Sequence, residues 1–334
     1  MTQTAIDRVP LKGLERPVSR IAFGCMSTVG SQTYDGLAEA EAIATMRAAF
    51  EQGINFFDTA RAYADGESER LLGLAVKGFR DEVVIASKPK AGDLSAEEIR
   101  GECEHSLRSL DMERIDLYQI HWPKRKVPLE ETVRAMEDLV SSGKVGAIGV
   151  CNFGPDDLGE WTGLGPCATN QIAYNILFRG CEFELQSKCE RQGIGILCYS
   201  PLAQGLLAGR YATADEVPVG RARTRHFDTN RPEARHGEAG CEADTFEAIA
   251  GIRAVADDLD RPMSEVALAW LLHQPAVASV LVGASRPDQV ERNVKAATLE
   301  LSAEDLARLN TATAPVKKHL GPSIDLWESP PRTR

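Results

Sequence analysis

The sequence Asn55-Phe56-Phe57-Asp58-Thr59-Ala60-Arg61-Ala62-Tyr63 starts as an apolar run and ends with a carboxylate and a phenol five positions apart. Such a run is typical of a buried strand that delivers polar groups at its carboxyl end. Two later stretches share this form: Val83–Ser87 is followed by Lys88, and Asp116–Ile120 is followed by His121. If the three strands are parallel neighbours, the acid, the phenol, the ammonium and the imidazole all lie at one mouth.

Eight runs of this apolar kind alternate with helical patterns along the 334 residues. They are Ile21–Gly24, Phe56–Asp58, Val83–Ser87, Leu117–Ile120, Val145–Val150, Ala168–Ala173, Gly195–Tyr199 and Val277–Val282. Strict alternation of strand and helix favours a parallel sheet, and strands that are apolar throughout are covered on both faces. Eight units, without a G-x-G-x-x-G motif after an early strand, favour a closed (β/α)8 TIM barrel over an open doubly wound sheet. We expect one barrel domain over residues 1–334.

The overall composition narrows the classes of partner. A net charge of −11 argues against nucleic acid or an anionic membrane surface as a partner. No apolar run approaches the roughly 18 residues of a membrane span, and the first residues lack a signal-peptide pattern. The eight cysteines form no C-x-x-C pair. We therefore predict free thiols in a reducing cytoplasm.

Three segments depart from the strand and helix rhythm. Residues 7–20 hold two short extended pieces around Gly13, which predict a hairpin before the barrel. Residues 203–241, after the seventh strand, are irregular and rich in arginine, which predicts a lid over the mouth. The tail 315–334 contains four prolines and Trp327, and it could either cover the mouth or fray.

His226, His236 and Cys241 lie in or beside the irregular segment and raise the question of a metal site. Their spacing is irregular and no fourth ligand accompanies them, so we predict no metal.

The polar groups at the strand ends suit reversible proton transfer. A tyrosine ordinarily titrates near ~10, and an ammonium within ~4–6 Å lowers the pKa of a phenol by ~1–3 units. We expect Asp58 to pair with Lys88 and keep it charged, so that Tyr63 donates and accepts protons near neutral pH. His121 would orient a substrate oxygen. Each residue also has an ordinary structural explanation, as a cap, a core residue or a solvated strand end, and the case for function rests on their joint occurrence.

The later strand ends suggest a cofactor. Gly283-Ala284-Ser285-Arg286-Pro287 ends the last strand and opens a helix, where Ser285 can cap the helix and Arg286 can bind a phosphate monoester. Tyr199 offers a flat ring, and the following residues to Gly205 offer backbone amides for phosphates. Asn152 and Gln171 can bind a primary amide. A ring carrying an amide and a phosphate-rich nucleotide together describe a nicotinamide dinucleotide.

These motifs together resemble the aldo-keto reductase superfamily, and the resemblance runs from Phe23-Gly24 to Asn293. It is carried by Phe57-Asp58-Thr59-Ala60 with Tyr63, Gly66-Glu67-Ser68-Glu69, Ile85-Ala86-Ser87-Lys88, Asp116-Leu117-Tyr118-Gln119-Ile120-His121-Trp122-Pro123, Gly149-Val150-Cys151-Asn152-Phe153, Tyr199-Ser200-Pro201-Leu202 and Gly283-Ala284-Ser285-Arg286. The long segment 203–241 is similar to that of the sugar-oxidoreductase and channel-subunit-like branches.

The resemblance implies NADP(H)-dependent reduction of aldehydes or ketones, or oxidation of the corresponding alcohols or sugars, by hydride transfer. It places a catalytic tetrad on Asp58, Tyr63, Lys88 and His121, with Tyr63 as the proton donor and Tyr63, His121 and Trp122 at the substrate. The expected cofactor contacts are Gly24, Met26, Asp58, Asn152, Gln171, Tyr199, Ser200, Pro201, Leu202, Gly205, Gly283, Ser285, Arg286, Gln289 and Asn293. Cys151 departs from the serine usual before the amide-binding Asn152, and a thiol is a weaker donor.

Two other functions stay open at this point. One is a redox-sensing binding subunit that holds NADPH and turns over slowly, as in the channel-associated members of the superfamily. The other is a barrel isomerase or aldolase that uses Lys88 as a Schiff base. Asp58 and Tyr63 argue against the second. The substrate, the physiological direction and the oligomeric state do not follow from the sequence.

Overall fold

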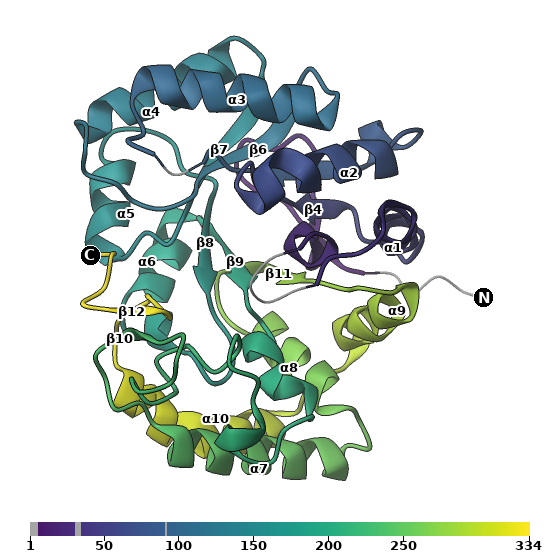
Figure 1. The fold of residues 1–334 in the computed structure, drawn as a ribbon, viewed down its shortest axis with the longest axis vertical. Helices are drawn as coiled ribbons and strands as arrows, with labels where there is room; N and C mark the ends of the chain where they lie inside the picture. The colour runs from purple at the N-terminus through teal and green to yellow at the C-terminus, as the bar shows by residue number, and fades with distance from the viewer. Residues whose placement is uncertain (1–5, 31–34, 91) are drawn as a thin grey trace.

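The computed structural model describes residues 6–30, 35–90 and 92–334, and its centre is a closed parallel barrel of eight strands (Figure 1). In barrel order the strands are β3 (Ile21–Gly24), β4 (Phe56–Asp58), β5 (Val84–Ser87), β6 (Ile115–Ile120), β7 (Val145–Cys151), β8 (Thr169–Ala173), β9 (Gly195–Tyr199) and β11 (Val277–Val282). The barrel closes where Val280 of β11 pairs with Ile21 of β3. The predicted (β/α)8 barrel is confirmed.

A layer of helices surrounds the barrel (Figure 1). The helices are α1 (Glu39–Glu51), α2 (Glu67–Ala75), α3 (Ala96–Leu110), α4 (Leu129–Ser141), α5 (Pro155–Thr162), α6 (Leu185–Gln192), α7 (Glu242–Asp258), α8 (Met263–Leu272), α9 (Pro287–Lys295) and α10 (Ala303–Leu320). Ser95 caps α3 by accepting a hydrogen bond from the Glu98 N–H. Within the described ranges, no helix is long and apolar enough to cross a membrane.

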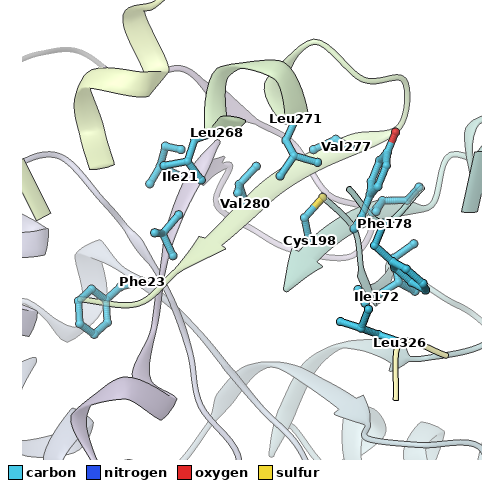
Figure 2. Close-up of a cluster of buried hydrophobic side chains, with 14 of the residues drawn as sticks. Ile21, Phe23, Ile172, Phe178, Cys198, Leu268, Leu271, Val277, Val280 and Leu326 are labelled. Carbon is cyan, nitrogen blue, oxygen red and sulfur yellow. The ribbon is translucent and has the colours of Figure 1, made fainter. Parts of the chain in front are cut away.

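Two apolar layers hold the barrel together. Side chains that point outward pack under the helices: Figure 2 shows Ile21 of β3 and Val280 of β11 beside Leu268 and Leu271 of α8. Side chains that point inward fill the barrel itself, and Phe56 is among them. Full burial of one such aliphatic or aromatic side chain contributes about 1.5–3 kcal/mol, so the two layers supply most of the driving force.

A hairpin closes the amino-terminal end of the barrel, as predicted. Its strands are β1 (Arg8–Val9) and β2 (Val18–Ser19), which pair antiparallel. Leu11 of the connecting turn is buried in the same cluster as the inward side chains of the barrel. A Cβ at Gly195 would lie 2.4 Å from a Leu11 methyl, so only glycine fits there. The hairpin therefore plugs the bottom of the barrel, and the opposite end stays open for a site.

The segment after β9 and the C-terminal tail are joined over the open end. The segment contains η5 (Ala203–Ala208), η6 (Ala214–Glu216) and β10 (Arg235–His236), and β10 pairs in parallel with β12 (Glu328–Ser329) of the tail. Arg225, which is buried, donates to the carbonyls of Leu320 (2.9 Å) and Asp325 (3.3 Å). The tail is therefore held against the segment after β9, and its Trp327 lines the cavity at the open end.

The start of the tail differs from the expectation. The tail was expected to span residues 315–334, but α10 continues through Pro315 to Leu320, before Gly321. A helical proline removes only one backbone hydrogen bond and strains the preceding turn. Here Val316 and Leu320 are buried, and their packing outweighs that cost. Only residues 321–334 form the covering tail.

Asp325 organises that tail. Its side chain is fully buried, and it accepts two hydrogen bonds from the Arg332 guanidinium, both 2.8 Å, and others from the N–H groups of Trp327 and Glu328. Burial alone would raise the pKa of Asp325, but Arg332 and these N–H groups outweigh burial and lower it.

Replacing Asp325 with Ala should lower the free energy of unfolding by about 3 kcal/mol, because it removes a fully buried carboxylate that is the acceptor for Arg332 and for three backbone N–H groups. Glu328→Gln is the control, since Glu328 also pairs with Arg332, at 3.2 Å, but is partly exposed. That control should change stability by less than about 1 kcal/mol. Urea denaturation measures both, and equal losses in the two variants would contradict the role given to Asp325.

Candidate active site

Lys88 lies at the bottom of the open end, where β4 and β5 finish. It is fully buried, and its Nζ donates to Asp58 Oδ2 (2.6 Å) and to the Thr59 carbonyl (2.8 Å). Burial opposes the charged form of Lys88, but Asp58 and then Tyr63 outweigh that effect and raise its pKa. The ammonium is thus charged and fixed, and the ion pair expected from the strand ends is present.

The second oxygen of Asp58 binds two amides. Asp58 Oδ1 accepts from Gln171 Nε2 at 2.8 Å and from Gln119 Nε2 at 3.2 Å. Gln171 was an expected site residue, whereas Gln119 was not, although it lies two positions before His121 in an inward-facing position of β6. Period-two alternation along that strand is the signal that could have identified it.

Tyr63 and His121 lie above the ion pair. The Lys88 ammonium is 5.3 Å from the centre of the Tyr63 ring, and the Tyr63 and His121 rings meet edge to face with centroids 6.1 Å apart. Burial raises the pKa of Tyr63 to about 12, although Lys88 pulls it down. Burial, and then Lys88 and Lys124, lower the pKa of His121 to about 3.

These values correct one expectation. Lys88 was expected to lower the pKa of Tyr63 towards neutrality, but in the structure the pKa of Tyr63 is raised. The physical reason is that desolvation of the phenolate in the closed site exceeds the attraction of the ammonium. Near neutral pH, Tyr63 is therefore a neutral phenol and His121 a neutral imidazole.

A cavity of about 620 Å3 opens above these groups. The expected residues that line it are Gly24, Met26, Asp58, Tyr63, His121, Trp122, Asn152, Gln171, Tyr199, Ser200, Pro201, Leu202, Gly205, Gly283, Ser285, Gln289 and Trp327. Lys88 lies beneath its floor. Arg286 and Asn293, which were expected to contact the cofactor, are not among the lining residues.

One wall of the cavity carries a hydrogen-bonded chain of Tyr199, Asn152 and the His121 carbonyl. Tyr199 donates to Asn152 Oδ1 at 2.8 Å, and Asn152 Nδ2 donates to the His121 carbonyl at 3.0 Å. Asn152 has a φ of 61°, in the left-handed region that non-glycine residues rarely adopt. Ser200 and Gln204 share this feature, with φ of 51° and 57°. Backbone strain concentrated around one cavity is typical of functional sites.

The end of the cavity beside β11 differs from the expectation. Ser285 does not cap α9; instead its N–H and its hydroxyl both donate to Gln289 Oε1, at 2.7 and 3.1 Å. The helix nevertheless starts at Pro287, as predicted. Arg286 is exposed, and its Nε donates to Asp288 Oδ1 at 3.0 Å. Sequence reasoning missed Asp288 because a carboxylate in the first turn of a helix is so common.

The segment after β9 contributes Arg210, Arg221 and Arg223 to the cavity wall. The sequence shows an arginine-rich segment, but only the folded loop reveals which of them face inward. Arg221 lies over Gly205, where a Cβ would be 2.9 Å from Nη1. Arg223 stacks on Trp327, with 4.9 Å between its guanidinium carbon and the ring centroid.

The histidines of this segment have structural roles. His226 Nε2 lies 3.1 Å from the Leu177 carbonyl, and His236 Nε2 lies 3.1 Å from the Thr224 carbonyl. Over the part of the chain that the structure describes, no three His, Cys, Asp or Glu side chains cluster as metal ligands would.

The chain matches a known protein family over most of its length. The sequence model of the Aldo/keto reductase family matches residues 20–314. The chain is 32% identical over 319 residues to the probable aldo-keto reductase 1 of Glycine max, covering 92% of this chain and 89% of that protein. It is 33% identical to the NADH-specific methylglyoxal reductase of Escherichia coli, covering 90% and 96%. A probable voltage-gated potassium channel subunit beta of Arabidopsis thaliana is 30% identical, covering 84% and 87%.

Solved structures agree with the sequence relatives. A glycerol dehydrogenase from Gluconobacter oxydans superposes with a TM-score of 0.80 at 28% identity, covering 94% of this chain and 96% of that one. An aldo-keto reductase from Klebsiella pneumoniae, in complex with NADPH, gives 0.72 at 27% identity, covering 96% and 97%. The fold and the comparisons define a barrel oxidoreductase of a class that acts on small carbonyl compounds. The chain belongs to the aldo/keto reductase family.

Proposed function

We propose that this chain is an NADP(H)-dependent reductase of aldehydes or ketones, able to oxidise the corresponding alcohols or sugars, with Tyr63 as the proton donor. The observation that carries the proposal is the buried Asp58–Lys88 pair directly beneath Tyr63, in a cavity that Tyr63 and His121 line. The free, buried state of the eight cysteines supports a reducing, cytoplasmic location as part of the same proposal.

The residues around the cavity fit a nicotinamide dinucleotide. Asn152 and Gln171 present buried amide side chains that suit a carboxamide, and Tyr199 presents a ring for stacking. Arg210 and Arg221 place positive charge along the wall near Gly205, where phosphates would lie. NADPH in the Klebsiella pneumoniae relative supports NADP(H), whereas the NADH-specific Escherichia coli relative shows that the family does not fix this choice.

The nicotinamide, when bound, supplies the hydride for reduction and accepts it for oxidation. Tyr63 donates its phenolic proton to the substrate oxygen as the carbonyl becomes an alcohol. The fixed ammonium of Lys88 stabilises the phenolate that this transfer leaves, and Asp58 keeps that ammonium charged and in place. The neutral His121 donates a hydrogen bond that orients the same oxygen.

The direct test measures NADPH oxidation with a panel of aldehydes, ketones and aldoses, and NADP reduction with alcohols and polyols. Single-turnover oxidation of bound NADPH, compared with the steady-state rate, separates an enzyme from a redox-sensing subunit. If the single-turnover and steady-state rates are both fast, the result supports an enzyme. Slow single-turnover oxidation with every substrate would leave only a binding role for the cofactor.

The pH dependence should differ between the two directions. Tyr63, with a pKa of about 12, keeps its proton throughout the usual range, so the kcat for reduction should be flat between about pH 6 and 9. Oxidation needs the phenolate, whose fraction rises about tenfold per pH unit below that pKa, so its rate should rise with pH. Stopped-flow rates in both directions measure this. An inflection near 6.5 in reduction would indicate a titrating His121, contrary to its pKa of about 3.

A further inference from the structure

The end of the cavity beside β11 carries little charge of its own. Gly283, Ser285 and Gln289 line it, and none of them is ionisable. The nearest cation in the sequence, Arg286, is directed to Asp288 with Nε 3.0 Å from Oδ1, and its side chain is 63% exposed. The guanidinium that was expected to bind a phosphate monoester therefore has a carboxylate as its partner.

Asp288 is shared between two cations. Its Oδ2 accepts from Arg292 Nη2 at 2.8 Å, one helical turn later. The remaining charged residues of α9, Glu291 and Lys295, pair with each other at 3.4 Å. The cluster of Arg286, Asp288 and Arg292 thus has a net charge of +1, where the two arginines alone would provide +2.

Asp288 also occupies the first turn of α9, where the N–H groups of a helix favour an anion. A carboxylate fixed at this point repels a second anion that approaches the same turn. A 2′-phosphate carries about −1.5 to −2 charges near neutral pH, so the repulsion acts on NADP(H) much more than on NAD(H). A carboxylate can accept a hydrogen bond from a ribose 2′-hydroxyl, as it does in open dinucleotide-binding sheets.

We propose that Asp288 is a cofactor-selectivity residue that restrains Arg286 and weakens binding of the 2′-phosphate, so that the chain uses NADH as well as NADPH. The inference rests on the proposed function, because it requires a nicotinamide dinucleotide in the cavity with its adenosine beside α9. Exposed ion pairs contribute little to stability, so replacing Asp288 should leave the fold intact and allow cofactor binding to be compared directly.

The test uses the full-length protein and the variant Asp288→Asn. Dissociation constants for NADPH and NADH come from the fluorescence of the reduced cofactor, and kcat/KM for both is measured with one carbonyl substrate. Wild type should bind both cofactors with constants within about tenfold. The variant should bind NADPH about three- to tenfold more tightly, the effect of one unit charge at a few ångströms, and NADH within about twofold of wild type. The gain should shrink as salt rises.

Glu291→Gln is the matched control, because it removes the same charge from the same helix. It should leave the ratio of the two dissociation constants within about twofold. Arg286→Ala should weaken NADPH binding more in the Asp288→Asn background than in wild type, since Asp288 no longer restrains the guanidinium. Both results support the assignment.

Three results would overturn it. The first is an unchanged ratio in Asp288→Asn, and the second is an equal change in Glu291→Gln. The third is a wild type that discriminates against NADH by a factor of a thousand or more. In each of these cases the protein still binds a nicotinamide dinucleotide, so the proposed carbonyl reductase is not contradicted. Absence of binding by either cofactor would instead remove the proposed function, and this inference with it.

Discussion

Replacing Tyr63 with Phe should lower kcat for carbonyl reduction by about 10^3-fold, within the range of 10^2 to 10^4 that general acid catalysis contributes. The phenolic hydroxyl is the proton source in the proposed mechanism. The dissociation constant for NADPH should stay within about twofold of wild type. Single-turnover oxidation of bound NADPH measures the chemical step apart from binding.

Tyr118→Phe is the matched control for this prediction. Tyr118 is a fully buried tyrosine of β6 that does not line the cavity. Removal of its hydroxyl should leave kcat within about twofold. The proposed role of Tyr63 fails if Tyr63→Phe keeps more than about a tenth of the wild-type rate on a good substrate, or if the two variants lose activity equally.

Replacing Lys88 with Met should affect stability and turnover together. The change leaves Asp58, only 4% exposed, without its cation and with two amides as donors. Removal of one partner of a buried ion pair typically costs about 3–5 kcal/mol in the free energy of unfolding. The phenolate of Tyr63 also loses its counter-charge, so kcat should fall by about 10^2-fold or more.

A double variant separates the two effects. Lys88→Met with Asp58→Asn removes the uncompensated charge and should recover part of the lost stability, but none of the lost turnover. Lys77→Met is the control for losing a lysine, because Lys77 forms an exposed pair with Asp111 and should cost less than about 1 kcal/mol. Urea denaturation and kcat are measured on all of them. Turnover that returns in the double variant would show that the ammonium has no part in the chemistry.

The site could be predicted best where strands end. Asp58, Lys88 and His121 each terminate an apolar run, and parallel neighbours in a barrel bring such termini together at one face. The Asp58–Lys88 pair therefore followed from spacing and topology alone. Asn152, Gln171 and Tyr199 followed in the same way, from later strands. Gln119 was missed because it lies inside its strand, where only its two-residue spacing from His121 marks it as facing the same way.

Loops and helix starts were less predictable, because several side chains compete for the same partners there. Ser285 has the right type and position to cap α9, but Gln289 folds back and accepts from it. Arg286 has the right type for a phosphate, but Asp288 holds it away from the cavity. The sequence shows the arginines of the 203–241 segment, but only the folded segment shows that Arg210, Arg221 and Arg223 line the cavity.

The sequence by itself determined the barrel, the hairpin before it and the polar groups at the strand ends, because hydrophobic periodicity and the order of strands along the chain do not depend on the details of packing. The tertiary structure decided the continuation of α10 through Pro315, the partner of Arg286 and the protonation of Tyr63. Each of these depends on a balance between distant groups. For Tyr63, the sequence predicts that the Lys88 ammonium lies near the phenol. Only the folded site shows that burial raises the pKa of Tyr63 by more than Lys88 lowers it.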